Sequence, residues 1–170
     1  MTYCRISCPV KRESRKDERR VCTNHYLNEN LSFNLKSLGN LSFDKGTWLY
    51  VGSAMGLGST SLENRIRRHF RSEKTIHWHV DHLLNSDSKI RASIWSESFS
   101  PAECEIAKSI DRMVDVNPGP RGFGASDCKQ KCGTHLFQTK IGNDLEKRIQ
   151  DVFRNLNLEP EITRDGILNI

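Results

Sequence analysis

The stretch GTWLYVGSAMG at residues 46–56, followed by LENRIRRHFR at residues 62–71, decides the fold of this chain. Thr47 to Val51 are β-branched, aromatic and aliphatic residues, which predict a strand. The Gly- and Ser-rich residues 52–61 predict a loop, and Ser61 is a candidate N-cap for the helix that follows. We therefore expect a strand, a glycine-rich turn and a strongly basic helix in immediate succession.

The rest of the chain alternates between short strands and helices. Residues 11–20 are a mixed charge run without an apolar face, and they predict a solvated loop. Strands are predicted at residues 2–10, 31–44, 90–95 and 133–140, helices at 77–84, 100–114 and 144–156, and a turn at 117–124. This pattern predicts a small central sheet with helices packed on it, an α+β fold.

Length and composition fit a globular protein of one domain, or one domain with a small appendage. The chain has 170 residues, of which 36% are hydrophobic and 28% are charged. No apolar run approaches the ~20 residues that a membrane helix needs, and the first ten residues are too polar for a secretory signal. We expect a cytoplasmic protein that does not bind membranes. Its formal net charge of +5 favours nucleic acid as the partner.

The basic helix and the strand before it carry candidate functional groups. Arg65 and His69 are four residues apart and share a helix face, and Tyr50 and Ser53 precede them around the turn. A phenol, a guanidinium, an imidazole and free backbone N–H groups are the parts needed to hold and cut a phosphodiester. Other basic residues either contact nucleic acid or form a solvated face: Arg67, Arg68, Arg71 and Lys74.

The order of these motifs resembles the GIY-YIG nuclease superfamily. Tyr50-Val51-Gly52-Ser53 is followed by Arg65 and His69, as in that superfamily, and the YVGSAM signature is similar to a prokaryotic subgroup of unknown function. Three further motifs of the subgroup follow in order, HWHVD at 77–81, ECEIA at 103–107 and GFGASDC at 122–128. The resemblance extends to about Phe137.

The resemblance implies a small antiparallel sheet of three strands flanked by helices. A nuclease domain would cover residues 1–140, with an insertion around 11–30, and a C-terminal helix and tail at 141–170 would pack on the same domain. The family's first motif lies on the first strand and would fall at Met1-Thr2-Tyr3, where the family's glycine is absent.

The implied activity is metal-dependent endonucleolytic hydrolysis of nucleic acid, with DNA as the expected substrate, in DNA repair or processing. One Mg²⁺ or Mn²⁺ would be held by a glutamate of the later helix, with Glu103 preferred and Glu105 in reserve. The alternative for either glutamate is a surface position. A protein that kept this fold and binds nucleic acid without cutting it is the alternative function.

Several residues are candidates to move the proton in such a reaction. The resemblance points to a tyrosine, Tyr50 or Tyr3, or to His69, and it places a histidine near the site, either His77 or His79. The ordinary pKa of tyrosine is near 10, so Arg65 or the metal would have to lower it.

The cysteines permit a second metal site. Cys128, Cys132 and His135 form a Cys-x3-Cys-x2-His pattern that could be part of a zinc site, with Cys104 as a fourth ligand. Buried or free thiols are the alternative. A zinc-stabilised structural protein is a third interpretation of the whole chain. It predicts stoichiometric zinc and unfolding by a chelator.

Overall fold

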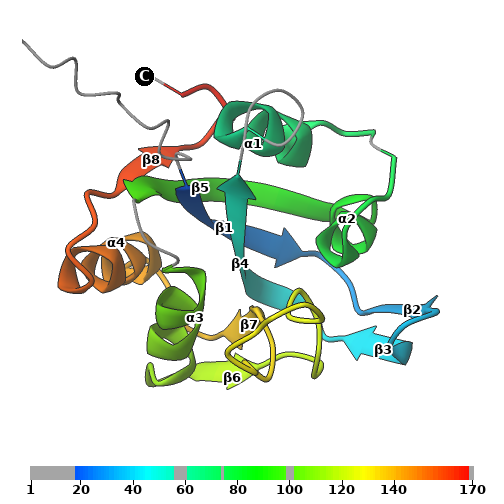
Figure 1. The fold of residues 1–170 in the computed structure, drawn as a ribbon. Helices are drawn as coiled ribbons and strands as arrows, with labels where there is room; N and C mark the ends of the chain where they lie inside the picture. The colour runs from blue at the N-terminus through cyan, green and yellow to red at the C-terminus, as the bar shows by residue number, and fades with distance from the viewer. Residues whose placement is uncertain (1–17, 56–60, 74, 99–101, 169–170) are drawn as a thin grey trace, which may run out of the picture.

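The computed structural model describes residues 18–55, 61–73, 75–98 and 102–168, and its centre is an antiparallel sheet (Figure 1). The sheet has six strands in the order β6-β7-β4-β1-β5-β8. The strands are β1 (Glu18–Leu27), β4 (Gly46–Met55), β5 (Ser88–Ser98), β6 (Val116–Pro118), β7 (Leu136–Thr139) and β8 (Glu161–Thr163). The expected α+β class with an antiparallel central sheet is confirmed, but the three strands implied by the resemblance are too few.

The two faces of the sheet are covered by different elements. Alternate residues of β4 point to opposite faces. Leu49 and Val51 pack with α3 (Glu103–Asp111) and α4 (Leu145–Asn155). Trp48 and Tyr50 pack on the other face, with α2 (His79–Leu84) and with the hairpin of β2 (Leu31–Leu35) and β3 (Gly39–Phe43). Further along that face, Ala54 packs with α1 (Leu62–Phe70).

The first described strand corrects two expectations. Residues 18–20 belong to β1 and are not a solvated loop, and residues 18–27 are not an insertion, because β1 lies between β4 and β5 and pairs with both. The strand was hidden in the sequence because its buried centre is polar: Thr23, Asn24 and His25 are all buried. The strand predicted at residues 2–10 lies outside the described residues.

The strand at residues 47–51 is longer than predicted, because β4 continues to Met55 where a loop was expected. The basic helix α1 begins as predicted, because the Ser61 side chain accepts a hydrogen bond from the Asn64 backbone N–H at 3.3 Å. The other predicted helices and strands within the described residues lie close to their expected positions. None of the helices in the described part of the chain has the length and apolar character needed to span a membrane.

Candidate active site and metal centre

A polar cavity of about 360 Å³ opens where β4, α1, α2, the start of α3 and the loop between β6 and β7 meet. Strand β7 pairs with β4 over Thr47–Tyr50, with one further hydrogen bond at Val51, so among the described residues no strand pairs with the later half of β4 on this side, which we call its free edge. The cavity is lined by Tyr50, Ser53, Arg65, His77, Trp78, His79, Glu103, Gly124, Ser126 and Asp127.

Arg65 reaches from α1 across β4 to the free edge. Its Nη1 donates to the Ser53 carbonyl oxygen, and its Nη2 donates to the Tyr50 hydroxyl oxygen at 3.3 Å. The Arg65 side chain can pass over β4 in this way because residue 52 is glycine. A Cβ on Gly52 would lie 2.7 Å from Arg65 Nη2 and 3.1 Å from the Tyr50 ring. The YVG sequence therefore fixes the guanidinium of the following helix.

Tyr50 is buried beneath this guanidinium. On its other side the ring lies against Gly124, where a Cβ would come within 2.8 Å of it. Burial raises the pKa of Tyr50, and Arg65 offsets this only in part. Arg65 thus acts in the expected direction, but burial has the larger effect, and Tyr50 is protonated at neutral pH. Because its oxygen accepts from Arg65, its own O–H group can donate to a ligand.

Arg68 has a structural contact in place of the predicted contact with nucleic acid. Its Nη2 donates to Asp81 Oδ2 at 2.7 Å and also to the Thr75 carbonyl. The same Asp81 oxygen accepts the backbone N–H groups of His77 and Trp78 at 2.8 and 2.9 Å. Asp81 is fully buried. It therefore holds the start of α2 to α1.

Trp78 forms the wall between these two arginines. The guanidinium carbons of Arg65 and Arg68 lie 4.6 and 4.9 Å from the centre of its ring. Such contacts are favourable because the face of an indole carries negative charge density. The indole therefore helps to fix Arg65 within the cavity.

The three candidate histidines have different surroundings. His77 is exposed and lines the cavity, and its ring makes no hydrogen bond among the described residues. His79 has both nitrogens engaged, since Nδ1 accepts from the Gly124 N–H at 3.3 Å and Nε2 lies 3.2 Å from the Ser37 hydroxyl. Burial and then the neighbouring His82 lower the pKa of His79. These contacts give His79 a structural role as a neutral imidazole.

His69 is not among the residues that line the cavity. It is 1% exposed, and its ring centre lies 6.4 Å from that of Tyr50 and 6.5 Å from that of Trp78. It shares the buried face of α1 with Arg65, as predicted. However, it lies one helical turn further along, behind Tyr50.

The other predicted contacts with nucleic acid are dispersed. Arg67 is exposed and forms a salt bridge with Glu63 at 2.7 Å, and Arg71 is exposed next to a different cavity. Lys74 and Tyr3 lie outside the described residues.

In the central sheet, β1 pairs with β4 along the full length of β4, and Thr23 of β1 lies opposite Tyr50.

Of the two candidate glutamates, Glu103 lines the cavity and Glu105 does not. Glu105 accepts a hydrogen bond from Gln130 at 3.4 Å outside it. Burial would raise the pKa of Glu103, but hydrogen bonds from His135 and Ser53 and the charge of Arg65 outweigh burial and lower it. Glu103 is therefore a carboxylate at neutral pH, beside Arg65 and Ser53.

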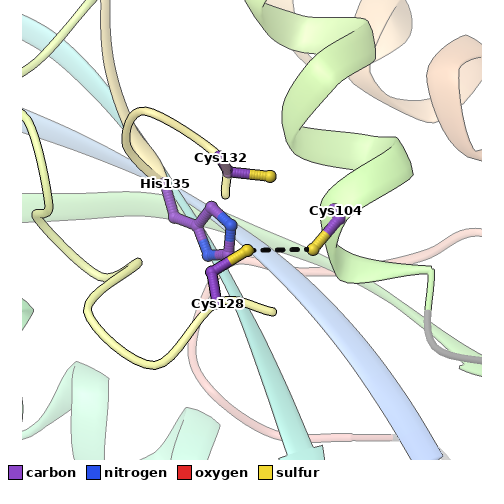
Figure 2. A group of neighbouring side chains, drawn as sticks. All are labelled: Cys104, Cys128, Cys132 and His135. Carbon is purple, nitrogen blue, oxygen red and sulfur yellow. Dashed lines mark hydrogen bonds between the residues drawn. The ribbon is translucent and has the colours of Figure 1, made fainter. Parts of the chain in front are cut away.

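Next to Glu103 is a cluster of four residues that could hold a metal ion. Cys104, Cys128, Cys132 and His135 offer ligand atoms that all lie within 4.8 Å of one another, and Figure 2 shows their side chains converging. Hydrogen bonds from Cys132 and Cys104 offset the effect of burial and lower the pKa of Cys128 to about 7. The sequence pattern of these four residues thus corresponds to a real grouping in space.

Sequence reasoning missed several residues of the cavity wall. Trp78, Gly124, Ser126 and Asp127 all line it. The GFGASDC motif at 122–128 contains three of them. The motif was recognised in the sequence, but its contact with Tyr50 was not predicted.

The fold and site are those of a small α+β protein with Tyr50, Arg65 and Glu103 in one cavity, beside a Cys3His cluster. The family model described as a domain of unknown function, DUF123, matches residues 24–158, and the chain belongs to this family. No curated protein and no solved structure matches the chain.

Proposed function

We propose that this protein is a metal-dependent endonuclease of the GIY-YIG type, acting on DNA in the cytoplasm during repair or processing. The observation that carries the proposal is the single cavity shared by Tyr50, Arg65 and Glu103. These residues come from three different elements, β4, α1 and α3. Their order along the chain is the one that the resemblance to that superfamily requires.

Arg65 and Tyr50 bind and stabilise the phosphate in this proposal. Arg65 is fixed by Ser53, Tyr50 and Trp78, so its positive charge is held in place before a substrate arrives. A charge that is already positioned stabilises the negative charge that grows on the phosphate oxygens during attack. Tyr50, which is protonated at neutral pH, donates its O–H group to the same phosphate or to the attacking water.

His77 is the strongest candidate for taking the proton from the attacking water. Its ring is exposed in the cavity, and histidine is the side chain that most often transfers protons in enzyme reactions. His79 and His69 suit this role less well, because the nitrogens of His79 are engaged and His69 lies behind Tyr50.

The residues present fit the divalent ion that the superfamily uses. Glu103 is an ionised carboxylate, and Asp127 lines the same cavity, so hard oxygen donors are available for Mg²⁺ or Mn²⁺. Glu103 would hold the ion with one oxygen while the other bonds to His135. When bound, such an ion would supply positive charge for the leaving oxygen.

The test is cleavage of nicked, branched and single-stranded DNA in the presence of Mg²⁺ or Mn²⁺. Arg65→Ala and Glu103→Gln are expected to lose at least about a hundredfold in rate, the scale of one lost charge-stabilising contact. Arg67→Ala is the matched control, because it removes an exposed arginine of the same helix. Equal activity of all three variants and the wild type would refute the assignment.

A nucleic-acid-binding protein without catalysis is the second candidate. The observation that favours it is the raised pKa of Tyr50, which leaves an exposed histidine as the base. It predicts salt-sensitive DNA binding that Arg65→Ala weakens, with no metal-dependent cutting of any substrate. Binding titrations at two salt concentrations, run beside the cleavage assay, separate the two functions.

A further inference from the structure

We propose that Cys104, Cys128, Cys132 and His135 bind one zinc ion in a tetrahedral site, and that Glu103 orients His135 toward it. This site is a centre separate from the catalytic ion of the proposed function. The inference does not depend on that function, and it would hold for a protein that cuts no substrate.

The spacing of the sulfur atoms fits a zinc ion better than a disulfide. Cys104 Sγ and Cys128 Sγ are 3.4 Å apart. A disulfide requires about 2.05 Å. A zinc ion about 2.3 Å from each sulfur in a tetrahedron would place the sulfurs about 3.8 Å apart. The ligand atoms of all four residues lie within 4.8 Å of one another, so small rotations of the side chains would complete the site.

His135 presents the correct nitrogen to the sulfur atoms. Its Nδ1 bonds to Glu103 Oε1 at 3.0 Å, and its side chain is 3% exposed. The other ring nitrogen, Nε2, is buried and has no hydrogen-bond partner among the described residues. In Figure 2 the ring carries a nitrogen on the side that faces the three sulfurs. A buried nitrogen without a partner is costly, and a metal ion would satisfy it.

The bond between Glu103 and His135 matches a recurrent feature of zinc sites. A histidine ligand usually donates its second ring N–H to a carboxylate, which fixes the tautomer and the orientation of the ring. With Nδ1–H donating to Glu103, the lone pair of Nε2 points at the cluster. The same carboxylate would not be needed if the cluster held only thiols.

The site joins the start of α3 to a loop that side-chain hydrogen bonds already link to this helix. Cys104 lies in the first turn of α3, and the other three ligands lie in the irregular loop between β6 and β7. Long irregular loops inside a compact domain need a cross-link or a function. This loop also carries Phe123 and Gly124, which pack in the core and against the Tyr50 ring.

The donor set selects zinc over the other common ions. Three thiolates and one imidazole in a tetrahedron suit zinc, whereas magnesium and calcium prefer oxygen ligands. The three thiolates would leave the site with a net negative charge. Lys108 lines the same small surface hollow as Cys132 and offsets part of that charge.

The first experiment uses the unmodified, full-length protein. Metal analysis of protein purified without chelators is expected to give one zinc per chain, released when the thiols are blocked by a mercurial. Replacement by Co²⁺ should give the intense visible bands of a tetrahedral, sulfur-rich ion. Protein that contains no metal, contains iron, or has a Cys104–Cys128 disulfide would overturn the proposal.

Variants then assign the ligands. Cys132→Ser and His135→Gln should each release zinc at chelator concentrations that leave the wild type loaded. His77→Gln, which changes an exposed histidine outside the cluster, should keep its zinc. Where a ligand variant fails to fold, the Co²⁺ spectrum of the wild-type protein decides. Zinc retained with wild-type affinity in His135→Gln would remove this residue from the site.

Glu103→Gln tests the orienting role. Loss of such a carboxylate weakens metal binding by about tenfold to a hundredfold. Zinc should remain bound but exchange more readily in a competition titration with a chromophoric chelator. Unchanged competition would show that Glu103 has no share in the site. Zinc content measured in the same variant keeps the two proposals separate: cleavage lost while zinc stays bound concerns the catalytic ion, and cleavage retained with unchanged zinc competition contradicts both roles of Glu103.

Discussion

The cavity and the Cys3His cluster lie on either side of Glu103, and they differ in how their polar groups are satisfied. In the cavity, protein groups bind one another: Arg65 donates to Ser53 and Tyr50, and Arg68 donates to Asp81. In the cluster, the sulfur atoms of Cys104 and Cys128 lie 3.4 Å apart, and His135 Nε2 has no hydrogen-bond partner among the described residues. The cavity network therefore joins its elements by direct contacts, whereas the proposed zinc ion would join the residues of the cluster.

The largest expected effect comes from breaking the cavity network at its buried carboxylate. Asp81→Ala removes the acceptor of Arg68 and of two backbone N–H groups, and a broken buried pair costs about 3–5 kcal/mol of unfolding free energy. Chemical denaturation measures it. Asp151→Ala, which removes an exposed ion pair with Arg154, is the matched control and should change stability by under about 1 kcal/mol. An equal loss in both variants would contradict the comparison.

The next effect should come from overfilling the space between β4 and α1. Gly52→Ala places a methyl group 2.7 Å from Arg65 Nη2, and overpacking of this kind costs about 1–3 kcal/mol. Thermal unfolding should show a lower Tm, and under the proposed function cleavage should fall as Arg65 moves. Gly142→Ala, where an added Cβ meets nothing within 4 Å, should behave as wild type. Zinc content should be unchanged in both, since neither variant touches the cluster.

The smallest effect is expected at the start of the basic helix. Ser61→Ala removes the side-chain acceptor for the Asn64 N–H, which costs about 1 kcal/mol. Ser61→Asp should restore the cap and add a favourable charge at the helix N-terminus. Urea midpoints measure the stability of the two variants. The midpoint should change with the cap of α1, which carries Arg65 of the cavity, whereas zinc binding at the cluster should not change. A Ser61→Asp variant no more stable than Ser61→Ala would disprove the capping role.

The parts of the site that are close in sequence could be predicted. Tyr50 and Gly52 belong to one strand and Arg65 to the helix that follows, so local pattern placed them together. His69 was assigned to the same site because it shares a helix face with Arg65. Four residues along a helix also advance by about 6 Å, and this rise carries His69 behind Tyr50.

The parts that depend on distant contacts could not be predicted from local pattern. Arg68 looked like a residue available to bind phosphate because Asp81, its partner, is 13 positions away. Strand β1 was missed because its buried centre is polar, with Thr23 and His25 in contact at 2.6 Å, and a polar sequence of this kind is more typical of a surface segment. Cys104 could be proposed as the fourth ligand, but no local spacing supported it, because 24 positions separate it from Cys128.

The outermost strands of the central sheet have a consequence for association between chains. β6 and β8 are each three residues long, and β6 ends in Pro118, which has no N–H to offer. Long, flat outer strands can recruit the backbone of another molecule and seed aggregates, whereas short ones interrupted by proline resist this. At these two margins the sheet therefore offers a poor template for polymerisation.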